Sequence, residues 1–180
     1  MQDYSKTSKF LSLILRHKPE TIGISLDENG WAEVSEILEG INREGQRINM
    51  AILEEIVETN NKKRFCFNED KTKIRANQGH SIEVDVELSP TTPPPVLYHG
   101  TADRFYESIA RDGLQKRSRN HVHLSADTET AVNVGKRHGS PIVLKIDTEA
   151  MLTGGAVFYL SKNNIWLTDN VPAKFLEKIL

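Results

Sequence analysis

Apolar residues in the first half of the chain recur with helical spacing. We expect a first helix whose apolar face stops before Pro19, since a residue that precedes proline is disfavoured in the α region. A second helix should start at Ser35, and Asn49 should cap a third. The residues that define the three apolar faces are Phe10, Leu11, Leu13 and Ile14, then Ile37, Leu38 and Ile41, then Ile52, Leu53, Ile56 and Val57.

A β-hairpin is expected after the third helix. FCFNEDKTKIR, residues 65–75, has the pattern of two short strands with a turn at residues 68–71, and DENG at 27–30 predicts an earlier turn. Three helices followed by a hairpin is the order of a winged helix, whose wing would carry Lys71, Lys73 and Arg75. The same fold also serves as a protein-binding module, so this order alone does not decide the partner.

Short strands dominate the second half. We expect two helices, one near residues 102–112 that ends at Gly113 and one at about 127–138 that is closed by Gly139. Strands are expected at VLYH (96–99), HVHLS (121–125), PIVLKID (141–147), AVFYL (156–160) and NIWLTD (164–169). Short strands interrupted by two helices predict an α+β sandwich rather than a doubly wound parallel sheet.

The two halves meet at ELSPTTPPP, residues 87–95. Its four prolines favour an extended connector, because proline is excluded from helix interiors and central strands. We therefore expect a first domain at 1–86 and a second at 96–180.

Composition is that of a soluble globular protein, with 180 residues, 38% hydrophobic and 27% charged. The net charge of -2 conceals two basic segments, at 62–75 and 111–119, which favour a focused site for a phosphorylated partner. Cys66 is the only cysteine, and we expect it to be a small packed residue rather than a catalytic thiol. No stretch has the length of a signal peptide core or a membrane span, so we expect a cytoplasmic protein. We also expect a monomer.

Polar side chains alternate along RNHVHLS. In a strand, Arg119, His121, His123 and Ser125 would share one face, opposite Val122 and Leu124. A guanidinium, two imidazoles and a hydroxyl offer hydrogen-bond donors but no carboxylate, which points to an anionic ligand.

Two other interpretations of the histidines remain open. HxH with a third ligand binds zinc or iron in some proteins, but Glu129 is poorly spaced for that role and Arg119 would repel a cation, so we expect no metal. Histidines that only satisfy backbone groups are the other interpretation. Five of the six histidines lie in compact polar motifs, and His80 is the exception.

Six motifs in order carry a resemblance to a known family. LILRHKP, KKRF before the hairpin, LYHGT after the prolines, RxHVHLS, VGKRHG and IWLTDxVP extend over residues 9–176. Together they resemble the RNA 2'-phosphotransferase family of the Tpt1/KptA type. The resemblance implies an N-terminal winged-helix RNA-binding lobe and a C-terminal lobe with the split β-sandwich of ADP-ribosyltransferases, which binds NAD+.

The resemblance also implies an activity, namely NAD+-dependent removal of an internal 2'-phosphate of the kind left at tRNA splice junctions, as in RNA repair. The phosphate attacks the nicotinamide-bearing ribose carbon and expels nicotinamide. The adjacent ribose hydroxyl then attacks the phosphate, which yields RNA with a 2'-hydroxyl and ADP-ribose 1'',2''-cyclic phosphate.

Site residues follow from the matching motifs. The family's catalytic set would fall on Arg16, His17, Arg64 and Arg119, with Arg117 a less well placed rival for the last position. NAD+ would be bound by His99, Gly100, Thr101, His123, Ser125, Gly135 and Arg137, where Gly100 would let the backbone approach the dinucleotide. RNA would be bound by Lys63, Lys71, Lys73 and Arg75.

Rival functions stay open at this point. The ADP-ribose could be transferred to a terminal phosphate of RNA or DNA and left there, since the first step is common to both outcomes. A non-catalytic winged-helix protein would bind nucleic acid with steep salt dependence and no NAD+ turnover. A metal-dependent hydrolase would lose activity on chelation.

Overall fold

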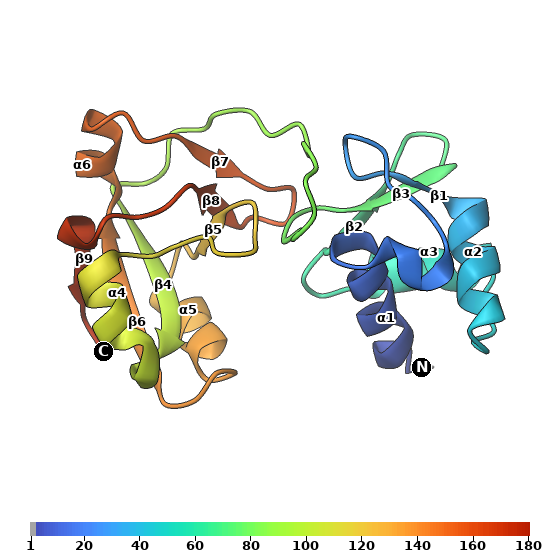
Figure 1. Ribbon diagram of the computed structural model, residues 1–180, viewed down its shortest axis with the longest axis horizontal. Helices are drawn as coiled ribbons and strands as arrows, with labels where there is room; N and C mark the ends of the chain where they lie inside the picture. Colours follow the sequence, from blue (N-terminus) through green and yellow to red (C-terminus); the bar gives the residue numbers. More distant parts are fainter. Residues whose placement is uncertain (1–2) are drawn as a thin grey trace. The chain divides into compact units, whose positions relative to one another are not determined.

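The structure, a computed structural model, describes residues 3–180 (Figure 1). The chain forms two compact units, unit 1 up to Glu87 and unit 2 from Leu88 to Leu180. Both units mix helices with short antiparallel strands, and the described residues form three small sheets, so the fold is of the α+β class.

Unit 1 contains three helices and one sheet. Its elements are α1 (Ser5–Arg16), the short 3-10 helix η1 (Pro19–Ile22), β1 (Ala32–Glu33), α2 (Val34–Arg43), α3 (Met50–Thr59), β2 (Phe65–Phe67) and β3 (Lys73–Ala76). The strands pair antiparallel in the order β1-β3-β2. The expected hairpin is confirmed, and Lys71 N–H donates to the Asn68 carbonyl within its turn.

The first helix buries a different set of leucines from the one we expected. Leu11, Ile14 and Leu15 are fully buried, whereas Leu13 is 36% exposed. Positions 11, 14 and 15 follow the i, i+3, i+4 spacing of one helical face, and Leu13 falls outside that face.

The start of α2 also differs. The helix begins at Val34 and not at Ser35, and its N-cap Glu33 makes no side-chain cap. Val34 N–H instead donates to the Thr72 carbonyl at 2.8 Å, so a contact with the hairpin satisfies a donor at the helix start. The Asn49 cap of α3 is confirmed, with its side-chain oxygen accepting from Ile52 N–H.

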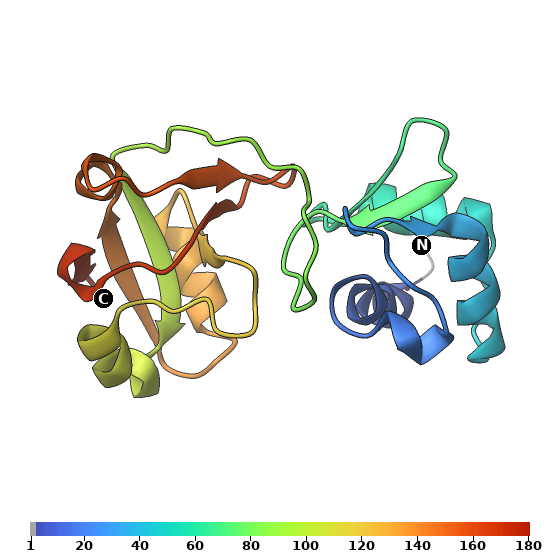
Figure 2. The same cartoon turned by 45° about the horizontal axis from the view of Figure 1, so that its top comes forward.

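Unit 2 contains two three-stranded antiparallel sheets, β4-β6-β9 and β5-β8-β7 (Figure 2). Isolated bridge pairing of Tyr98 with Ser125 connects β4 to the residue after β5. The elements are β4 (Val96–Ala102), η2 (Asp103–Phe105), α4 (Tyr106–Asp112), β5 (Val122–Leu124), α5 (Thr128–Gly135), β6 (Pro141–Asp147), α6 (Thr148–Thr153), β7 (Phe158–Leu160), β8 (Trp166–Thr168), η3 (Ala173–Phe175) and β9 (Leu176–Lys178).

All five expected strands of the second half are present, but one helix end is wrong and three elements were missed. Helix α5 ends at Gly135 rather than near residue 138, and the chain turns there with His138 N–H donating to the Gly135 carbonyl. Sequence analysis did not predict α6, η3 or β9.

The proline-rich stretch is bonded to unit 2. Thr91 N–H donates to the Phe158 carbonyl at 2.8 Å, and the Thr148 hydroxyl donates to the Pro94 carbonyl. Glu87, in contrast, is bound to Arg75 of unit 1. The division between the units therefore falls between residues 87 and 88, ahead of the prolines.

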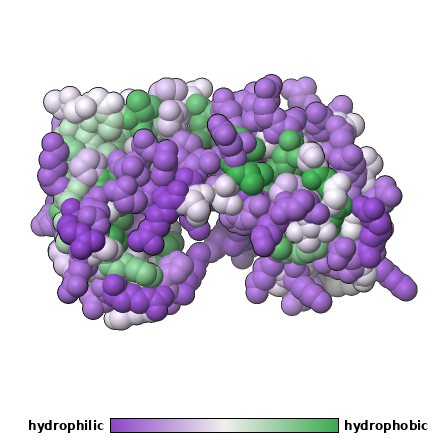
Figure 3. All heavy atoms as spheres, viewed as in Figure 1, coloured by the Kyte–Doolittle hydropathy of each residue, from purple (hydrophilic) through white to green (hydrophobic). Residues whose placement is uncertain are grey.

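The surface in view is mostly hydrophilic, with apolar atoms in scattered patches (Figure 3). Within residues 3–180, no helix combines the length and the apolar character needed to cross a membrane.

Candidate functional site

Two of the expected catalytic residues lie at the end of α1. Arg16 is its last residue, and His17 is its C-cap. Both are bonded to Ser81, whose N–H donates to the Arg16 carbonyl at 2.9 Å and whose Oγ lies 2.8 Å from His17 Nδ1. The segment after the hairpin thus fixes the place where α1 ends.

Arg64 is held by the same segment. Its main-chain carbonyl accepts from Asn77 N–H at 2.8 Å, and the Asn77 side-chain amide donates to the Lys63 carbonyl at 2.6 Å. Asn60 Oδ1 accepts from the Arg64 main chain and from its guanidinium. Residues 77–81, which we call the strap, therefore contact both the Arg16–His17 pair and the Lys63–Arg64 pair.

His80, the one histidine outside the polar motifs of the sequence, lies within the strap. Its side chain is buried, and its Nε2 has no hydrogen-bond partner. Burial, followed by the positive charges of Arg16, His17 and Arg75, lowers the pKa of His80 to about 4. His80 is therefore neutral near pH 7, and unit 1 keeps it uncharged among cations.

Arg75, which we expected on the wing as an RNA contact, lies on β3 with its side chain buried. Its guanidinium is only 6% exposed, donates to Glu87 at 2.9 Å and lies 4.3 Å from the centre of the Trp31 ring. An arginine paired and stacked in this way stabilises the unit. We leave it out of the proposed RNA surface.

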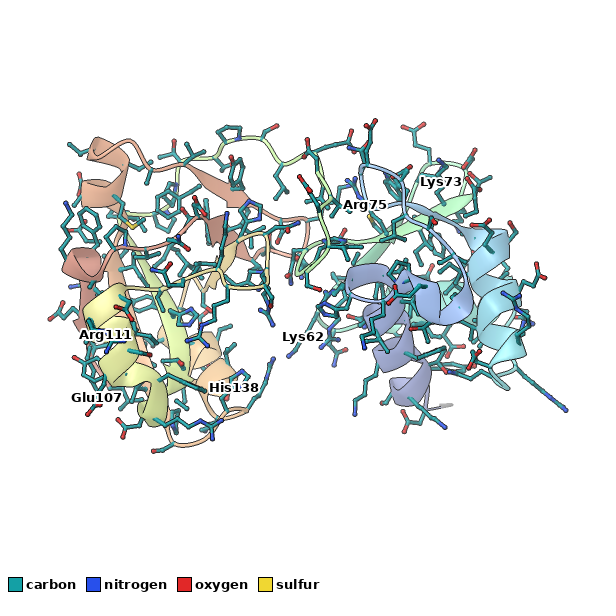
Figure 4. The ribbon with its side chains drawn as sticks, viewed as in Figure 1. Lys62, Lys73, Arg75, Glu107, Arg111 and His138 are labelled. Atoms are coloured by element: carbon teal, nitrogen blue, oxygen red, sulfur yellow. The ribbon has the colours of Figure 1, made fainter. Side chains whose placement is uncertain are left out.

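The lysines of the hairpin are accessible but paired. Lys71 binds Glu54, and this contact raises the pKa of the Lys71 ammonium. Lys73 lies 3.4 Å from Asp27 and 3.6 Å from Glu33; Figure 4 shows it on β3 with Arg75. Lys63, in the loop before β2, is exposed and donates from its ammonium to the Glu58 carbonyl.

In unit 2 the expected polar face is built differently from a continuous strand. β5 covers only residues 122–124, and Arg119 lies in a preceding turn in which its N–H donates to the Lys116 carbonyl. The Arg119 guanidinium nevertheless reaches His123, with 3.2 Å between Nη1 and Nδ1. Val122 and Leu124 are buried, as the alternation predicts.

His99 is joined to the same residue. Its Nδ1 lies 2.9 Å from the main-chain oxygen of His123, and because a carbonyl only accepts, this nitrogen carries the proton. Burial is the main cause that lowers the pKa of His99, and the charges of Arg119 and His138 lower it further. The neutral ring therefore has its lone pair on Nε2, which can accept a hydrogen bond from a hydroxyl group.

Ser125 and Thr101 lie beside this pair of histidines in the fold. Ser125 exchanges two main-chain hydrogen bonds with Tyr98, at 2.7 and 2.9 Å, which joins it to β4 next to His99. Both side chains are buried, at 9% exposure for Ser125 and 7% for Thr101. The His121 ring instead makes an edge-to-face contact with the Tyr159 ring, with the ring centroids 5.5 Å apart.

The two expected cofactor glycines have a packing role that sequence analysis missed. A Cβ added at Gly100 would lie 1.6 Å from the Ala131 carbonyl oxygen, and one at Gly135 would lie 2.7 Å from the Thr101 carbonyl oxygen. Both glycines thus let α5 approach β4 at backbone distance. The expectation that Gly100 lets the backbone approach the dinucleotide stays a prediction. Arg137 is exposed, in the turn after α5.

Among residues 3–180, no three His, Cys, Asp or Glu side chains come together as a potential metal site.

Comparison with known proteins identifies the family. The model of the RNA 2'-phosphotransferase, Tpt1 / KptA family matches residues 2–170. The chain belongs to this family. A probable RNA 2'-phosphotransferase of Fusobacterium nucleatum subsp. nucleatum is 60% identical over 178 residues, which cover 98% of this chain and 99% of the relative. Its namesake in Flavobacterium johnsoniae is 58% identical over 170 residues, 94% of this chain and 93% of the relative.

Membership of the RNA 2'-phosphotransferase family makes the protein an enzyme of the transferase class. The structure gathers Arg16, His17 and Arg64 around the strap in unit 1, and Arg119, His123 and His99 into one bonded group in unit 2. Sequence reasoning missed the strap itself, since Asn77 and Ser81 carry no local motif.

Proposed function

We propose that the protein removes an internal 2'-phosphate from RNA and uses NAD+ as co-substrate. Unit 1 would be the winged-helix lobe that binds RNA, and unit 2 the lobe with the ADP-ribosyltransferase fold that binds NAD+. The family match over residues 2–170 is the observation that carries this proposal. The three helices and hairpin sheet of unit 1 and the two antiparallel sheets of unit 2 are consistent with it.

The reaction suits a site rich in arginine. A phosphate monoester carries between one and two negative charges near neutral pH, so it attacks the nicotinamide-bearing carbon without a general base. The phosphate must instead be positioned for attack, and the guanidinium groups of Arg16, Arg64 and Arg119 would bind its oxygens. The same groups would stabilise charge at phosphorus when the ribose hydroxyl displaces the RNA oxygen.

NAD+ would be bound by unit 2. His99 Nε2 would accept from a ribose hydroxyl, and His123, whose Nδ1 accepts from Arg119, would donate from Nε2. Thr101, Ser125, Arg137 and the two glycines Gly100 and Gly135 complete the proposed set. Residues 155–168 contain no acid, which is consistent with a substrate phosphate in place of an activated nucleophile.

The decisive experiment is incubation of the purified protein with a short 2'-phosphorylated RNA and a chelator, with and without NAD+. We expect stoichiometric release of nicotinamide and formation of 2'-hydroxyl RNA only when NAD+ is present. The control RNA carries a 2'-hydroxyl at the same position. Strict dependence on a divalent metal, or equal turnover without NAD+, would refute the proposal.

The alternative outcome is visible in the same assay. A control RNA that carries only a 5'-terminal phosphate tests whether ADP-ribose is transferred and retained. Retention there, with the internal 2'-phosphate left intact, would replace our proposal by terminal-phosphate ADP-ribosylation. Tight binding of nucleic acid without nicotinamide release would leave only a winged-helix binding protein.

A further inference from the structure

The peptide that joins Lys63 to Arg64 is bound from both sides by asparagine side chains. Its N–H belongs to Arg64 and donates to Asn60 Oδ1 at 3.2 Å. Its carbonyl belongs to Lys63 and accepts from Asn77 Nδ2 at 2.6 Å. The next carbonyl, that of Arg64, accepts from the main-chain N–H of Asn77 at 2.8 Å. These three bonds fix the main chain at Arg64, and the main chain limits the directions that its side chain can take.

The orientation of the Asn77 amide follows from its partner. A carbonyl only accepts, so the amide atom next to the Lys63 oxygen is the nitrogen. Asn77 is 6% exposed, and within residues 3–180 its Oδ1 is buried without a hydrogen-bond partner. A buried acceptor without a partner lowers the stability of a fold. One half of this amide therefore holds the loop, whereas the other half does not stabilise the unit.

The conformation of Lys63 depends on such contacts. Its φ is +42°, in the left-handed region that residues other than glycine rarely adopt. The Lys63 N–H donates to the Asn60 carbonyl at 2.8 Å, and the Lys63 carbonyl is bound by Asn77. A residue stays in this region only where its surroundings hold it there. Without the Asn77 amide the loop can relax to negative φ, which would turn the peptide and displace the Arg64 side chain.

Asn60 connects the same loop to α1. Its Nδ2 donates to the Ser8 hydroxyl at 3.2 Å, and its Oδ1 lies 3.4 Å from Arg64 Nη1. At the other end of the strap, Ser81 N–H donates to the Arg16 carbonyl. The loop that carries Arg64 and the helix that carries Arg16 are thus bonded to each other within unit 1.

We propose that Asn77 is a positioning residue for the transfer of the 2'-phosphate: its amide holds the peptide between Lys63 and Arg64 and thereby directs the Arg64 guanidinium to the RNA phosphate. Asn60 supports the same peptide from its N–H side. The inference rests on the proposed function, in which Arg64 binds the phosphate. Asn77 acts through Arg64 and not on the substrate.

A double-mutant cycle on the full chain separates positioning from general stability. Asn77→Ala should lower the rate of 2'-phosphate removal at saturating substrates by about 10-fold, because misplacement of a substrate-positioning group by 1 Å costs up to about 100-fold. The KM for NAD+ should stay unchanged, since NAD+ is assigned to unit 2. In an Arg64→Ala background the same substitution should cost less than about 2-fold, because residues that act through one another are not additive.

Asn42→Ala is the matched control. Asn42 is exposed, its Nδ2 donates to the Ile48 carbonyl at 2.9 Å, and its Oδ1 accepts from Ile48 N–H at 2.8 Å. Its substitution therefore removes two bonds between a side chain and the main chain from another loop of unit 1. We expect a lower urea midpoint of unit 1 and a rate of 2'-phosphate removal within about 2-fold of the parent rate, because no group near Arg64 is changed.

Asn60→Ala tests the other side of the same peptide. Asn60 is half-buried, so this substitution perturbs the interior less than one at Asn77. It should slow the reaction in the parent background and have less than about a 2-fold effect in the Arg64→Ala background. Its result decides the question if Asn77→Ala does not fold.

Hydrogen exchange of the Arg64 main-chain amide gives a readout without substrate. The chain is labelled with 15N-arginine, and the signal that disappears in Arg64→Lys belongs to Arg64. Exchange should accelerate by about 5- to 10-fold in Asn77→Ala and in Asn60→Ala, which corresponds to the net contribution of one hydrogen bond. It should stay unchanged in Asn42→Ala.

The inference and the proposed function fail in different ways. Equal effects of Asn77→Ala on the rate in the parent and in the Arg64→Ala background would overturn the inference, as would an Asn77→Ala rate equal to that of the parent. A parent that leaves the 2'-phosphate in place when NAD+ is supplied would refute the proposed function. In that case faster exchange at Arg64 in Asn77→Ala would still support the hold on the peptide, and unchanged exchange would overturn it.

Discussion

The Arg119 guanidinium donates to His123 Nδ1 across 3.2 Å. Since a guanidinium has no acceptor, the pair orients the His123 ring and leaves its neutral form with the proton on Nε2. A residue proposed to bind the phosphate is thereby bonded to one proposed to bind NAD+. Substitution of Arg119 should therefore affect both the proposed phosphate binding and the proposed NAD+ binding of unit 2.

Replacement of Arg119 by alanine should slow 2'-phosphate removal by roughly 10²- to 10³-fold, the typical cost of losing one charge-assisted donor at a site of developing charge. The matched control is Arg117→Ala, since Arg117 is also exposed and lies two residues away. We expect the rate of 2'-phosphate removal by this control to stay within about 2-fold of the parent rate, because no charge-assisted donor to the phosphate is lost. Single-turnover rates with labelled RNA measure both, and a reversed order would assign the role to Arg117.

Substitution of Arg16 or His17 by alanine should impair the second step more than the first. The first step needs a positioned anion and a good leaving group, whereas the second must stabilise added charge at phosphorus. ADP-ribosylated RNA should therefore accumulate in a single-turnover time course and stay nearly undetectable in the parent. Lys18→Ala, next in the chain and exposed, is the control. Equal slowing of both steps would instead assign these residues to substrate binding.

The two lysines of the hairpin should contribute to RNA affinity through charge. Neutralising Lys71 and Lys73 together should reduce the slope of log K against log salt by up to about 1.4, because each phosphate contact on a single strand contributes roughly 0.7. Their ion pairs with Glu54 and Asp27 compete with RNA, so a smaller change is also consistent. The control removes two exposed lysines of α1, Lys6 and Lys9. An unchanged slope would make the hairpin purely structural.

Gly100→Ala should destabilise unit 2 by about 3 kcal/mol or more, because overpacking against backbone forces strands and helices apart. The added Cβ would collide with the Ala131 carbonyl, which cannot move without displacing α5. Urea unfolding followed by Trp166 fluorescence in a Trp31→Phe background measures the effect. Gly154→Ala, where the nearest atom to the new Cβ lies 3.3 Å away, is the control.

The stability of unit 1 should decrease as the pH falls from about 6.5 to about 4. His80 has a pKa of about 4 in the folded chain against an ordinary histidine value of 6.5, so over this range the unfolded chain binds a proton that the folded chain does not. The full effect is about 3 kcal/mol at the usual conversion of pKa shifts into free energy. Urea titrations at several pH values, followed by Trp31 fluorescence in a Trp166→Phe background, test this.

Comparison with His80→Gln isolates the contribution of His80. This variant should lose most of the slope, whereas the exposed control His138→Gln should keep it. A slope that survives in His80→Gln would assign the pH dependence to other groups.

Local chemistry made part of the fold predictable. Asn49 and Asp127 cap helices with their own side chains, and Gly113 ends α4 at a positive φ, so each boundary is set by nearby residues. Tertiary contacts set the others. Helix α2 begins at Val34, whose N–H donates to the Thr72 carbonyl, and strand β9 forms by pairing with β6, where Leu176 lies opposite Ile146. Neither partner is visible in the local sequence.

Some features of the candidate site could likewise be predicted from the local sequence, whereas others depend on contacts between distant residues. The alternation around His123 predicted the burial of Val122 and Leu124, because strand periodicity is local. The contact of Ser81 with His17 and the burial of Arg75 could not be predicted, since both depend on how residues 77–87 fold back onto helices and turns far away in sequence. The family resemblance marked the residues, but not the contacts between them.

The contacts of residues 77–87 with His17 and Arg75 determine where unit 1 can be separated from the rest of the chain. The regular structure of unit 1 ends with β3 at Ala76, where a fragment designed from strands and helices alone would stop. Such a fragment would discard Ser81 and the Glu87 carboxylate, and would leave the Arg75 guanidinium without its acidic partner. The shortest separable piece that preserves the contacts of His17 and Arg75 ends at Glu87.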